Sequence, residues 1–282
     1  MIIIKIIIIY FFIRNFYLVL KRKLRLQKKK KYNTKNISSF NIGSSHSELA
    51  FKSLNPDLHL NLAHPSQTLY YDYILLKKFK NKIVKNQNLT CFLTISYFTF
   101  YAPKLWQKEN IKNYYECLGM REIEREYRIE AFFYKYFPSL YKVYEKMKKN
   151  INKEIDVEKR IKKHIVILKE QKNLDFNIVI LEKIILLCRE NNIKLILLTT
   201  PFQKEYNSQF DEKLLEENFY KIISKIIKKY EIDYFDFSKD YINFNEKKYF
   251  ENYDFDHLSL EGSKKIIKIL NKKIAQKIKE KI

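Results

Sequence analysis

The 282-residue chain has little glycine, proline, cysteine or tryptophan: three, five, three and one residue respectively. With so few glycines, each position is informative, because glycine is favoured where the backbone bends unusually or is approached closely. The cysteines, Cys91, Cys117 and Cys188, are odd in number, form no C-x-x-C pair and sit in apolar surroundings. The sequence therefore indicates buried free thiols, with neither a disulfide framework nor a zinc site.

Acidic residues are also scarce relative to basic ones, which leaves a formal net charge of +23. The lysines are spread along the whole chain, whereas a nucleic-acid-binding protein concentrates basic residues in one motif or on one face. Specific nucleic-acid binding would thus rest on net charge alone, and we do not predict it. The charge does favour anionic partners such as acidic glycans or anionic lipids.

The N-terminus carries the one long apolar run. Residues 2–20 are almost long enough to cross a bilayer, but Arg14 and Asn15 interrupt them. Residues 21–31 hold eight basic side chains, and no small-residue cleavage pattern precedes them. We predict that residues 1–36 form a membrane anchor or membrane-surface helix with a basic linker. The basic run favours a cytoplasmic domain, and an apolar helix of the soluble domain is the alternative.

From residue 37 onward, strand-like and helix-like segments alternate. We expect strands at residues 38–42, 58–63, 89–100, 193–199 and 232–237, and helices at residues 68–80, 176–190, 211–230 and 263–282. This alternation predicts a three-layer α/β/α fold with a mostly parallel, flavodoxin-like sheet. Residues of about 103–172 are charged and aromatic, and we expect them to form a helical insertion within a domain that spans residues 37–282.

Two motifs suggest chemistry. Gly43 and Ser44 precede Ser45 directly after the first expected strand, which would place this serine at the carboxyl edge of the sheet. Alone, the serines could simply cap a helix. Near the C-terminus, however, Asp254 and His257 stand three residues apart, so the carboxylate can reach the imidazole. A carboxylate that orients a histidine, which in turn activates a serine, is the arrangement of nucleophilic acyl transfer.

Together these motifs resemble those of the SGNH (GDSL-like) hydrolases. Gly43-Ser44-Ser45 stands where the family has Gly-Asp-Ser, and Asp254-Phe255-Asp256-His257 matches its Asp-x-x-His block. The resemblance implies that Ser45 is the nucleophile, His257 the general base and Asp254 the residue that orients it. Asp256 is adjacent and is the alternative partner for His257.

The family's middle blocks, which supply the oxyanion hole, are less well matched. Ser66 stands in place of the glycine of the second block, so the resemblance implies that the backbone N–H groups of Ser45 and Ser66 form the hole. The asparagine of the third block has no counterpart in Ser96-Tyr97-Phe98-Thr99, and one donor is unassigned. His46 and His64 lie beside these motifs and are candidate substrate contacts.

The Gly-Ser-Ser variant is similar to proteins that acyl-modify cell-envelope carbohydrates. It implies a serine-dependent acyl-ester hydrolase or O-acyltransferase that acts on a cell-surface glycan or its precursor, is membrane-associated, and needs no metal or cofactor. The alternative is a weak or inactive SGNH-like protein of a membrane-associated polysaccharide-assembly complex. A lipase acting on long-chain esters is a further alternative, which a deep apolar channel at Ser45 would favour.

Overall fold

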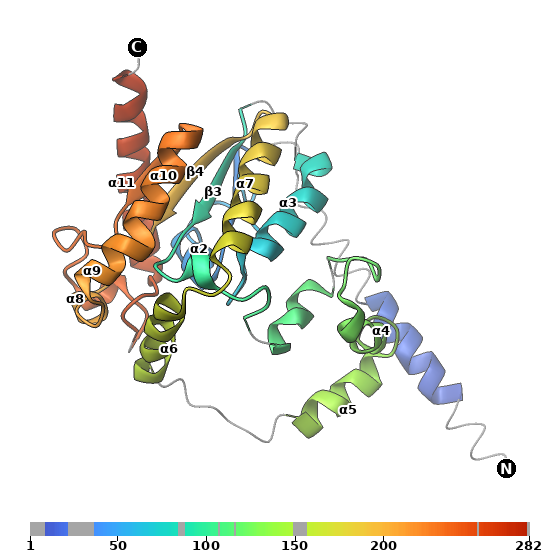
Figure 1. The fold of residues 1–282 in the computed structure, drawn as a ribbon. Helices are drawn as coiled ribbons and strands as arrows, with labels where there is room; N and C mark the ends of the chain where they lie inside the picture. The colour runs from blue at the N-terminus through green and yellow to red at the C-terminus, as the bar shows by residue number, and fades with distance from the viewer. Residues whose placement is uncertain are drawn as a thin grey trace. The chain divides into compact units, whose positions relative to one another are not determined.

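The computed structural model describes residues 9–21, 37–83, 88–106, 108–115, 117–148, 157–252 and 254–280. These residues divide between two compact units, one within residues 1–33 and 107–155 and the other within residues 34–106 and 156–282. The second unit contains the sheet and all the predicted site residues (Figure 1).

Five strands form the sheet: β1 (Ser39–Ile42), β2 (His59–Asn61), β3 (Thr90–Thr94), β4 (Lys194–Thr199) and β5 (Asp233–Asp236). Their spatial order is β2-β1-β3-β4-β5, and every neighbouring pair is parallel. In register, Phe40 faces Leu60 on one side and Cys91 on the other. The predicted α/β fold with a parallel sheet is therefore confirmed, and the order is that of flavodoxin-like sheets.

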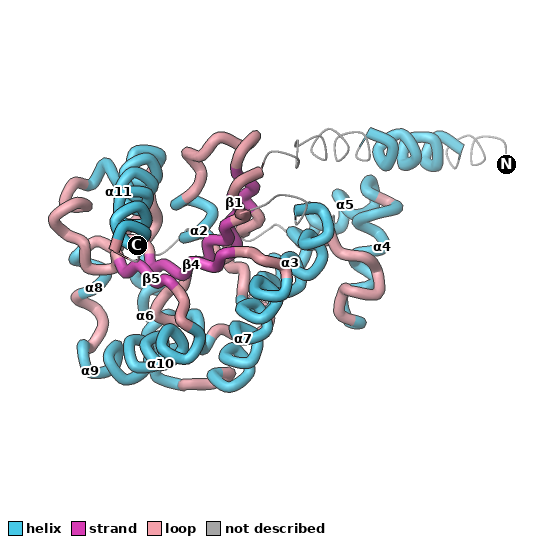
Figure 2. The backbone as a smooth tube through the Cα atoms, turned by 90° about the horizontal axis from the view of Figure 1, so that it is seen from above, coloured by secondary structure: helices cyan, strands magenta, loops and turns pink. Residues whose placement is uncertain are grey.

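Helices cover both faces of this sheet, because successive strand side chains point to opposite faces. Cys91 and Leu93 of β3 belong to the core under α3 (Leu69–Ile83), α7 (Leu174–Glu190) and α10 (Lys221–Tyr230). Phe92 between them belongs to the core under α2 (Ser45–Ala50) and α11 (Leu260–Lys279). Figure 2 shows the strands between these two helical layers.

The remaining elements of the α/β unit are short, apart from one helix. They are η1 (Thr99–Tyr101), α6 (Val157–Glu170), α8 (Lys204–Asn207), α9 (Glu212–Leu215), the π-helical turn η4 (Glu216–Tyr220) and η5 (Lys247–Tyr249). The helix expected over residues 211–230 is thus interrupted by one π-helical turn. Although α6 lies in the stretch expected to be an insertion, it belongs to the α/β unit.

The strand expected over residues 89–100 is too long, since β3 ends at Thr94. Beyond it, the Ser96 N–H donates to Thr99 Oγ1 (2.8 Å) and the Thr99 N–H donates to Ser96 O (2.9 Å). These reciprocal bonds fold residues 96–99 into a turn. The apolar and aromatic composition of this stretch reflects burial and does not reflect a strand.

The other unit is helical within its described residues. It contains a helix over residues 9–21, η2 (Lys108–Tyr114), η3 (Arg125–Tyr127), α4 (Arg128–Tyr136) and α5 (Pro138–Lys148). Asn15 is buried and accepts a hydrogen bond from the Ser139 N–H (3.2 Å), which links the N-terminal helix to α5. None of the helices within the described ranges combines the length and apolarity needed to span a bilayer.

Candidate active site

The predicted site residues lie at the carboxyl end of the sheet, where its strand order reverses. In the order β2-β1-β3-β4-β5, this switch occurs between β1 and β3, because the chain leaves β1 toward β2 and later returns to β3 on the opposite side. Ligands of open α/β folds bind in the crevice outside this point. Gly43 directly follows β1 and Ser45 begins α2, so the nucleophile predicted from sequence is placed at the switch point.

The turn between β1 and α2 requires a glycine. Gly43 has φ of +125°, which is unfavourable for residues with a side chain. A Cβ atom there would lie 2.6 Å from Thr94 Oγ1 and 2.9 Å from Ser47 Cβ. Strand β3 and the first turn of α2 therefore approach the Gly43 backbone closely, and this contact fixes the position of the serine two residues later.

Ser45, His257 and Asp254 form a continuous hydrogen-bonded chain, although 212 positions separate the serine from the histidine. Ser45 Oγ lies 2.7 Å from His257 Nε2, and His257 Nδ1 lies 2.8 Å from Asp254 Oδ2. A neutral His257 with its proton on Nδ1 donates to Asp254 and presents the Nε2 lone pair to the serine hydroxyl. This is the arrangement that allows a histidine to remove the proton of a nucleophilic serine.

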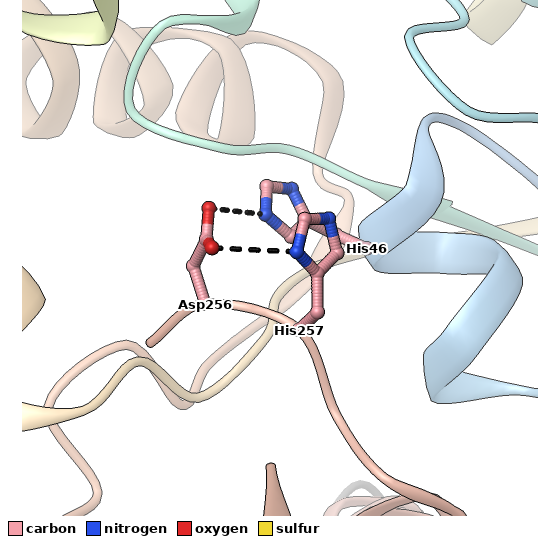
Figure 3. A group of neighbouring side chains, drawn as sticks. All are labelled: His46, Asp256 and His257. Atoms are coloured by element: carbon pink, nitrogen blue, oxygen red, sulfur yellow. Dashed lines mark hydrogen bonds and ion pairs between the residues drawn. The ribbon is translucent and has the colours of Figure 1, made fainter. Parts of the chain in front are cut away.

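Asp256 is a second carboxylate at this site, and it joins two histidines (Figure 3). Its Oδ1 lies 3.3 Å from His257 Nδ1, while its Oδ2 lies 3.1 Å from His46 Nε2. The two imidazole rings are stacked, with centroids 4.8 Å apart and planes inclined by 22°. Asp254 makes the shorter contact with His257, so it is the better candidate for the orienting residue, and Asp256 is a second partner.

Arg160 of α6 balances the two carboxylates. Its Nη1 and Nη2 contact Asp254 Oδ2 (3.2 Å) and Oδ1 (2.6 Å), and Nη2 also lies 2.5 Å from Asp256 Oδ1. A planar guanidinium can serve several carboxylate oxygens at once, which a lysine ammonium does less well. The arginine thus fixes the carboxylates that in turn hold His257.

Burial and these charges together shift the pKa values of the two histidines in opposite directions. Burial alone lowers the pKa of His257, but hydrogen bonds and attraction from Asp254 and Asp256 outweigh it and raise the pKa to about 9. Burial lowers the pKa of His46 despite its hydrogen bond to Asp256, so His46 is neutral. The pKa of Asp256 lies well below its usual range, because hydrogen bonds and attraction from the histidines overcome the effect of burial. The site therefore concentrates positive charge on His257.

The same group has the composition of a metal site, since His46, Asp256 and His257 offer ligand atoms within 4.8 Å of one another. The ring nitrogens involved already face Asp256, and a metal would have to replace both contacts. The Arg160 guanidinium also lies against Asp256 and opposes a second cation there. The geometry fits a hydrogen-bonded charge network better than a cation site.

The loop of residues 62–68, which we call the Ser66 loop, packs against the turn at Gly43 between β1 and α2. His64 N–H donates to Gly43 O (3.3 Å), and a single oxygen of Asp72, Oδ1, accepts from both Gly43 N–H (2.7 Å) and Gln67 Nε2 (2.6 Å). Ser66 has φ of +57°, in the region that favours the glycine expected there by resemblance. These contacts bring the loop that carries the Ser66 N–H to the turn that carries the Ser45 N–H.

Asp72 is itself unusual, because it is buried next to the site and, among the described residues, its carboxylate is bound by the neutral donors Gly43 N–H and Gln67 Nε2 and by no cation. Burial raises its pKa to about 7, and the hydrogen bonds from Gln67 and Gly43 oppose this rise only in part. Asp72 thus links the Gly43 turn and the Ser66 loop through a carboxylate that titrates near neutral pH.

The structure places the other predicted residues as follows. His46 is 3% exposed, and its Nδ1 lies 2.7 Å from Ser96 Oγ, so both ring nitrogens are engaged by the protein. A substrate contact through His46 would require one of these bonds to break. His64 is half-buried in the Ser66 loop. Ser96 begins the turn of residues 96–99 that follows β3, and its hydroxyl contacts His46.

Sequence reasoning missed Arg160 and Asp72, and for His46 it left a structural role as the alternative to a substrate contact without naming its partners, Asp256 and Ser96. One signal for Arg160 was present, since it is the only arginine in a helix otherwise rich in lysine. Arginine in place of lysine is favoured at multidentate carboxylate sites. Asp72 gave a weaker signal, as a single acid among the apolar residues that begin α3.

Comparison with known proteins adds no family to this picture. The chain matches no protein-family model, and no curated protein sequence is significantly similar to it.

Proposed function

We propose that this chain is a serine-dependent acyl-ester hydrolase or O-acyltransferase that acts on a cell-surface glycan or its precursor. The observation that carries the proposal is the 2.7 Å contact of Ser45 Oγ with His257 Nε2, continued by the 2.8 Å contact of His257 Nδ1 with Asp254. A serine, a histidine and a carboxylate in this order form a nucleophile, its general base and the group that orients the base.

In the proposed reaction, Ser45 Oγ attacks the ester carbonyl carbon while His257 Nε2 takes the hydroxyl proton. The N–H groups of Ser45 and Ser66 would stabilise the oxyanion of the tetrahedral intermediate. The bond to the alcohol oxygen then breaks, His257 returns its proton to that oxygen, and the acyl group stays on Ser45. Water, or a sugar hydroxyl in a transferase, attacks the acyl-enzyme with His257 again accepting the proton.

The Ser45 N–H suits its role because it is the first of helix α2 and has no acceptor inside the helix. For Ser66, no acceptor among the described residues takes its N–H. The glycan as substrate rests on the resemblance of the Gly-Ser-Ser motif to carbohydrate-modifying proteins, and the net charge of +23 favours an anionic one.

Two observations favour the alternative of a weak or inactive protein in a polysaccharide-assembly complex. The stretch Ser96-Tyr97-Phe98-Thr99 lacks the asparagine donor that the resemblance expects there, and the Ser96 hydroxyl is engaged with His46. Losing one oxyanion donor typically lowers the rate by about 10²–10³-fold. The raised pKa of His257 also keeps the base mostly protonated at neutral pH.

Labelling with a fluorophosphonate tests the proposal, because this probe reacts with activated serines. We expect the wild type to be labelled, faster at pH 9 than at pH 7, and the Ser45→Ala and His257→Ala variants to remain unlabelled. Ser44→Ala is the matched control, since it removes the neighbouring hydroxyl and should keep labelling. Folded wild-type protein that takes up no probe at either pH would refute the enzyme proposal and support the alternative.

Membrane association is a separate part of the proposal, and it rests on the N-terminal helix. Seven apolar or aromatic side chains on residues 9–20 are exposed: Ile9, Tyr10, Phe12, Ile13, Phe16, Tyr17 and Leu20. Such a helix can bury its apolar side chains in the interface of a bilayer. We expect the full chain to float with anionic vesicles and the double variant Phe12→Ser/Phe16→Ser to float less; equal flotation would count against this segment as the anchor.

A further inference from the structure

A strongly basic groove runs along α11, outside the residues of the proposed active site. It has a volume of ≈ 880 Å³, and we call it the α11 groove. Six lysines line it: Lys248, Lys264, Lys265, Lys268, Lys272 and Lys273. Glu261 is the one acidic residue among the described residues of its lining. The groove therefore carries a large local excess of positive charge.

The helix itself produces this arrangement. Lys264, Lys268 and Lys272 recur every four residues, so they form one row with a rise of about 6 Å between neighbours. All three are exposed, and no carboxylate lies within ion-pair distance of them among the described residues. Like charges at this spacing repel one another and destabilise a helix, so an anion in the groove would relieve an unfavourable arrangement.

The groove adjoins the segment that carries the catalytic histidine. Glu251 N–H donates to His257 O (2.9 Å) and Ser259 N–H donates to Tyr249 O (2.9 Å), so residues 249–251 pair antiparallel with residues 257–259. Tyr249 belongs to the groove lining, whereas His257 belongs to the proposed triad. Helix α11 begins at Leu260, directly after this paired segment.

The shape and lining indicate the chemistry of the ligand. A concave channel with a row of ammonium groups suits an extended polymer with spaced negative charges. Grooves for single-stranded nucleic acids add aromatic rings on which bases stack. Here the face of Tyr249 is covered by Lys265, whose Nζ lies 4.1 Å from the ring centroid, so this ring offers no free stacking surface on that side.

We propose that the α11 groove binds an anionic glycan chain and holds it beside the triad. That this chain carries the ester attacked by Ser45 rests on the proposed function, whereas binding itself does not. Lysine side chains would pair with carboxylate, sulfate or phosphate groups along the polymer, and no covalent step occurs in the groove.

The test measures binding of dextran sulfate to the full-length Ser45→Ala protein, with neutral dextran of equal length as the control polymer. The groove variant combines Lys264→Gln, Lys268→Gln and Lys272→Gln. The matched control combines Lys221→Gln, Lys225→Gln and Lys228→Gln on α10, which removes the same charge from three exposed lysines elsewhere. Thermal unfolding of all proteins verifies that each variant is folded.

We expect dextran sulfate to bind and neutral dextran not to bind. The dissociation constant should rise about tenfold in the groove variant and less than twofold in the control, since each exposed ion pair contributes modestly. Equal weakening in both variants would overturn the proposal, because binding would then follow net charge alone. Stronger, groove-dependent binding of a single-stranded oligonucleotide or of anionic vesicles would overturn it in favour of that ligand. Because the nucleophile is absent, these results are independent of whether Ser45 is reactive.

Discussion

Neutralising Asp256 should make the site more active near neutral pH. His257 has two carboxylate neighbours, with Nδ1 2.8 Å from Asp254 and 3.3 Å from Asp256. Together they raise its pKa to about 9. A base with this pKa is neutral in only about 1% of molecules at pH 7, so few molecules can accept the Ser45 proton.

In Asp256→Asn, one of the two negative charges is lost while the amide keeps the size of the side chain. An adjacent opposite charge shifts a pKa by about 1–3 units, and we take about one unit because Arg160 already offsets part of the charge. The pKa of His257 would then fall to about 8, and the neutral fraction at pH 7 would rise about tenfold. The labelling rate at pH 7 should increase by the same factor.

The assay is the rate of fluorophosphonate labelling between pH 6 and pH 10. The wild-type rate should rise with pH and level off above pH 9, and the Asp256→Asn profile should level off about one unit lower. Asp254→Asn is the contrasting variant: it removes the closer orienting group, and the rate should fall by about 10³-fold or more at every pH. An Asp256→Asn profile that is unchanged, or displaced to higher pH, would refute this account of the charges.

Three further predictions concern the groups around the triad. In Arg160→Gln, Asp254 and Asp256 lose their cation, so the pKa of His257 should rise and the labelling profile should move to higher pH. A profile that moves to lower pH would contradict this role of Arg160. Gly43→Ala should lower the free energy of unfolding by about 3 kcal/mol in urea titrations, given its positive φ and the close contacts of the added Cβ. Gly119→Ala is the control, where the Cβ meets only the flexible end of one side chain, and an equal loss there would argue against special strain at Gly43. The pKa of Asp72 is raised in the folded state, so the folded protein binds the Asp72 proton more tightly than the unfolded chain does. The free energy of unfolding of the wild type should therefore fall as pH rises from about 4 to about 7, by up to about 4 kcal/mol. Asp72→Asn should remove this pH dependence. Urea titrations at pH 5 and pH 8 should show a smaller difference for the variant, and an unchanged difference would rule out Asp72 as the source.

Local patterns in the sequence carry much of the fold. Alternating apolar strands and amphipathic helices predict the parallel sheet, since each segment must bury its own apolar face. The pattern failed at residues 95–100, where burial made a turn look like the end of a strand. There, the Ser96 and Thr99 hydrogen bonds decided the backbone path. Composition reports burial well, but it does not distinguish a buried turn from a buried strand.

The sequence by itself determined which residue types could do chemistry and how two short motifs are spaced. Gly43 next to Ser45, and Asp254 three residues before His257, are local arrangements that the chain order sets directly. Only the tertiary structure decided that these motifs meet, that Arg160 joins both carboxylates, and that the His46 ring is buried against His257. The reason is physical: these contacts join positions about 100–200 residues apart. Ser45 and His46 follow β1 and His257 follows β5, and parallel strands bring their carboxyl ends to one edge of the sheet, where Arg160 reaches the carboxylates from α6.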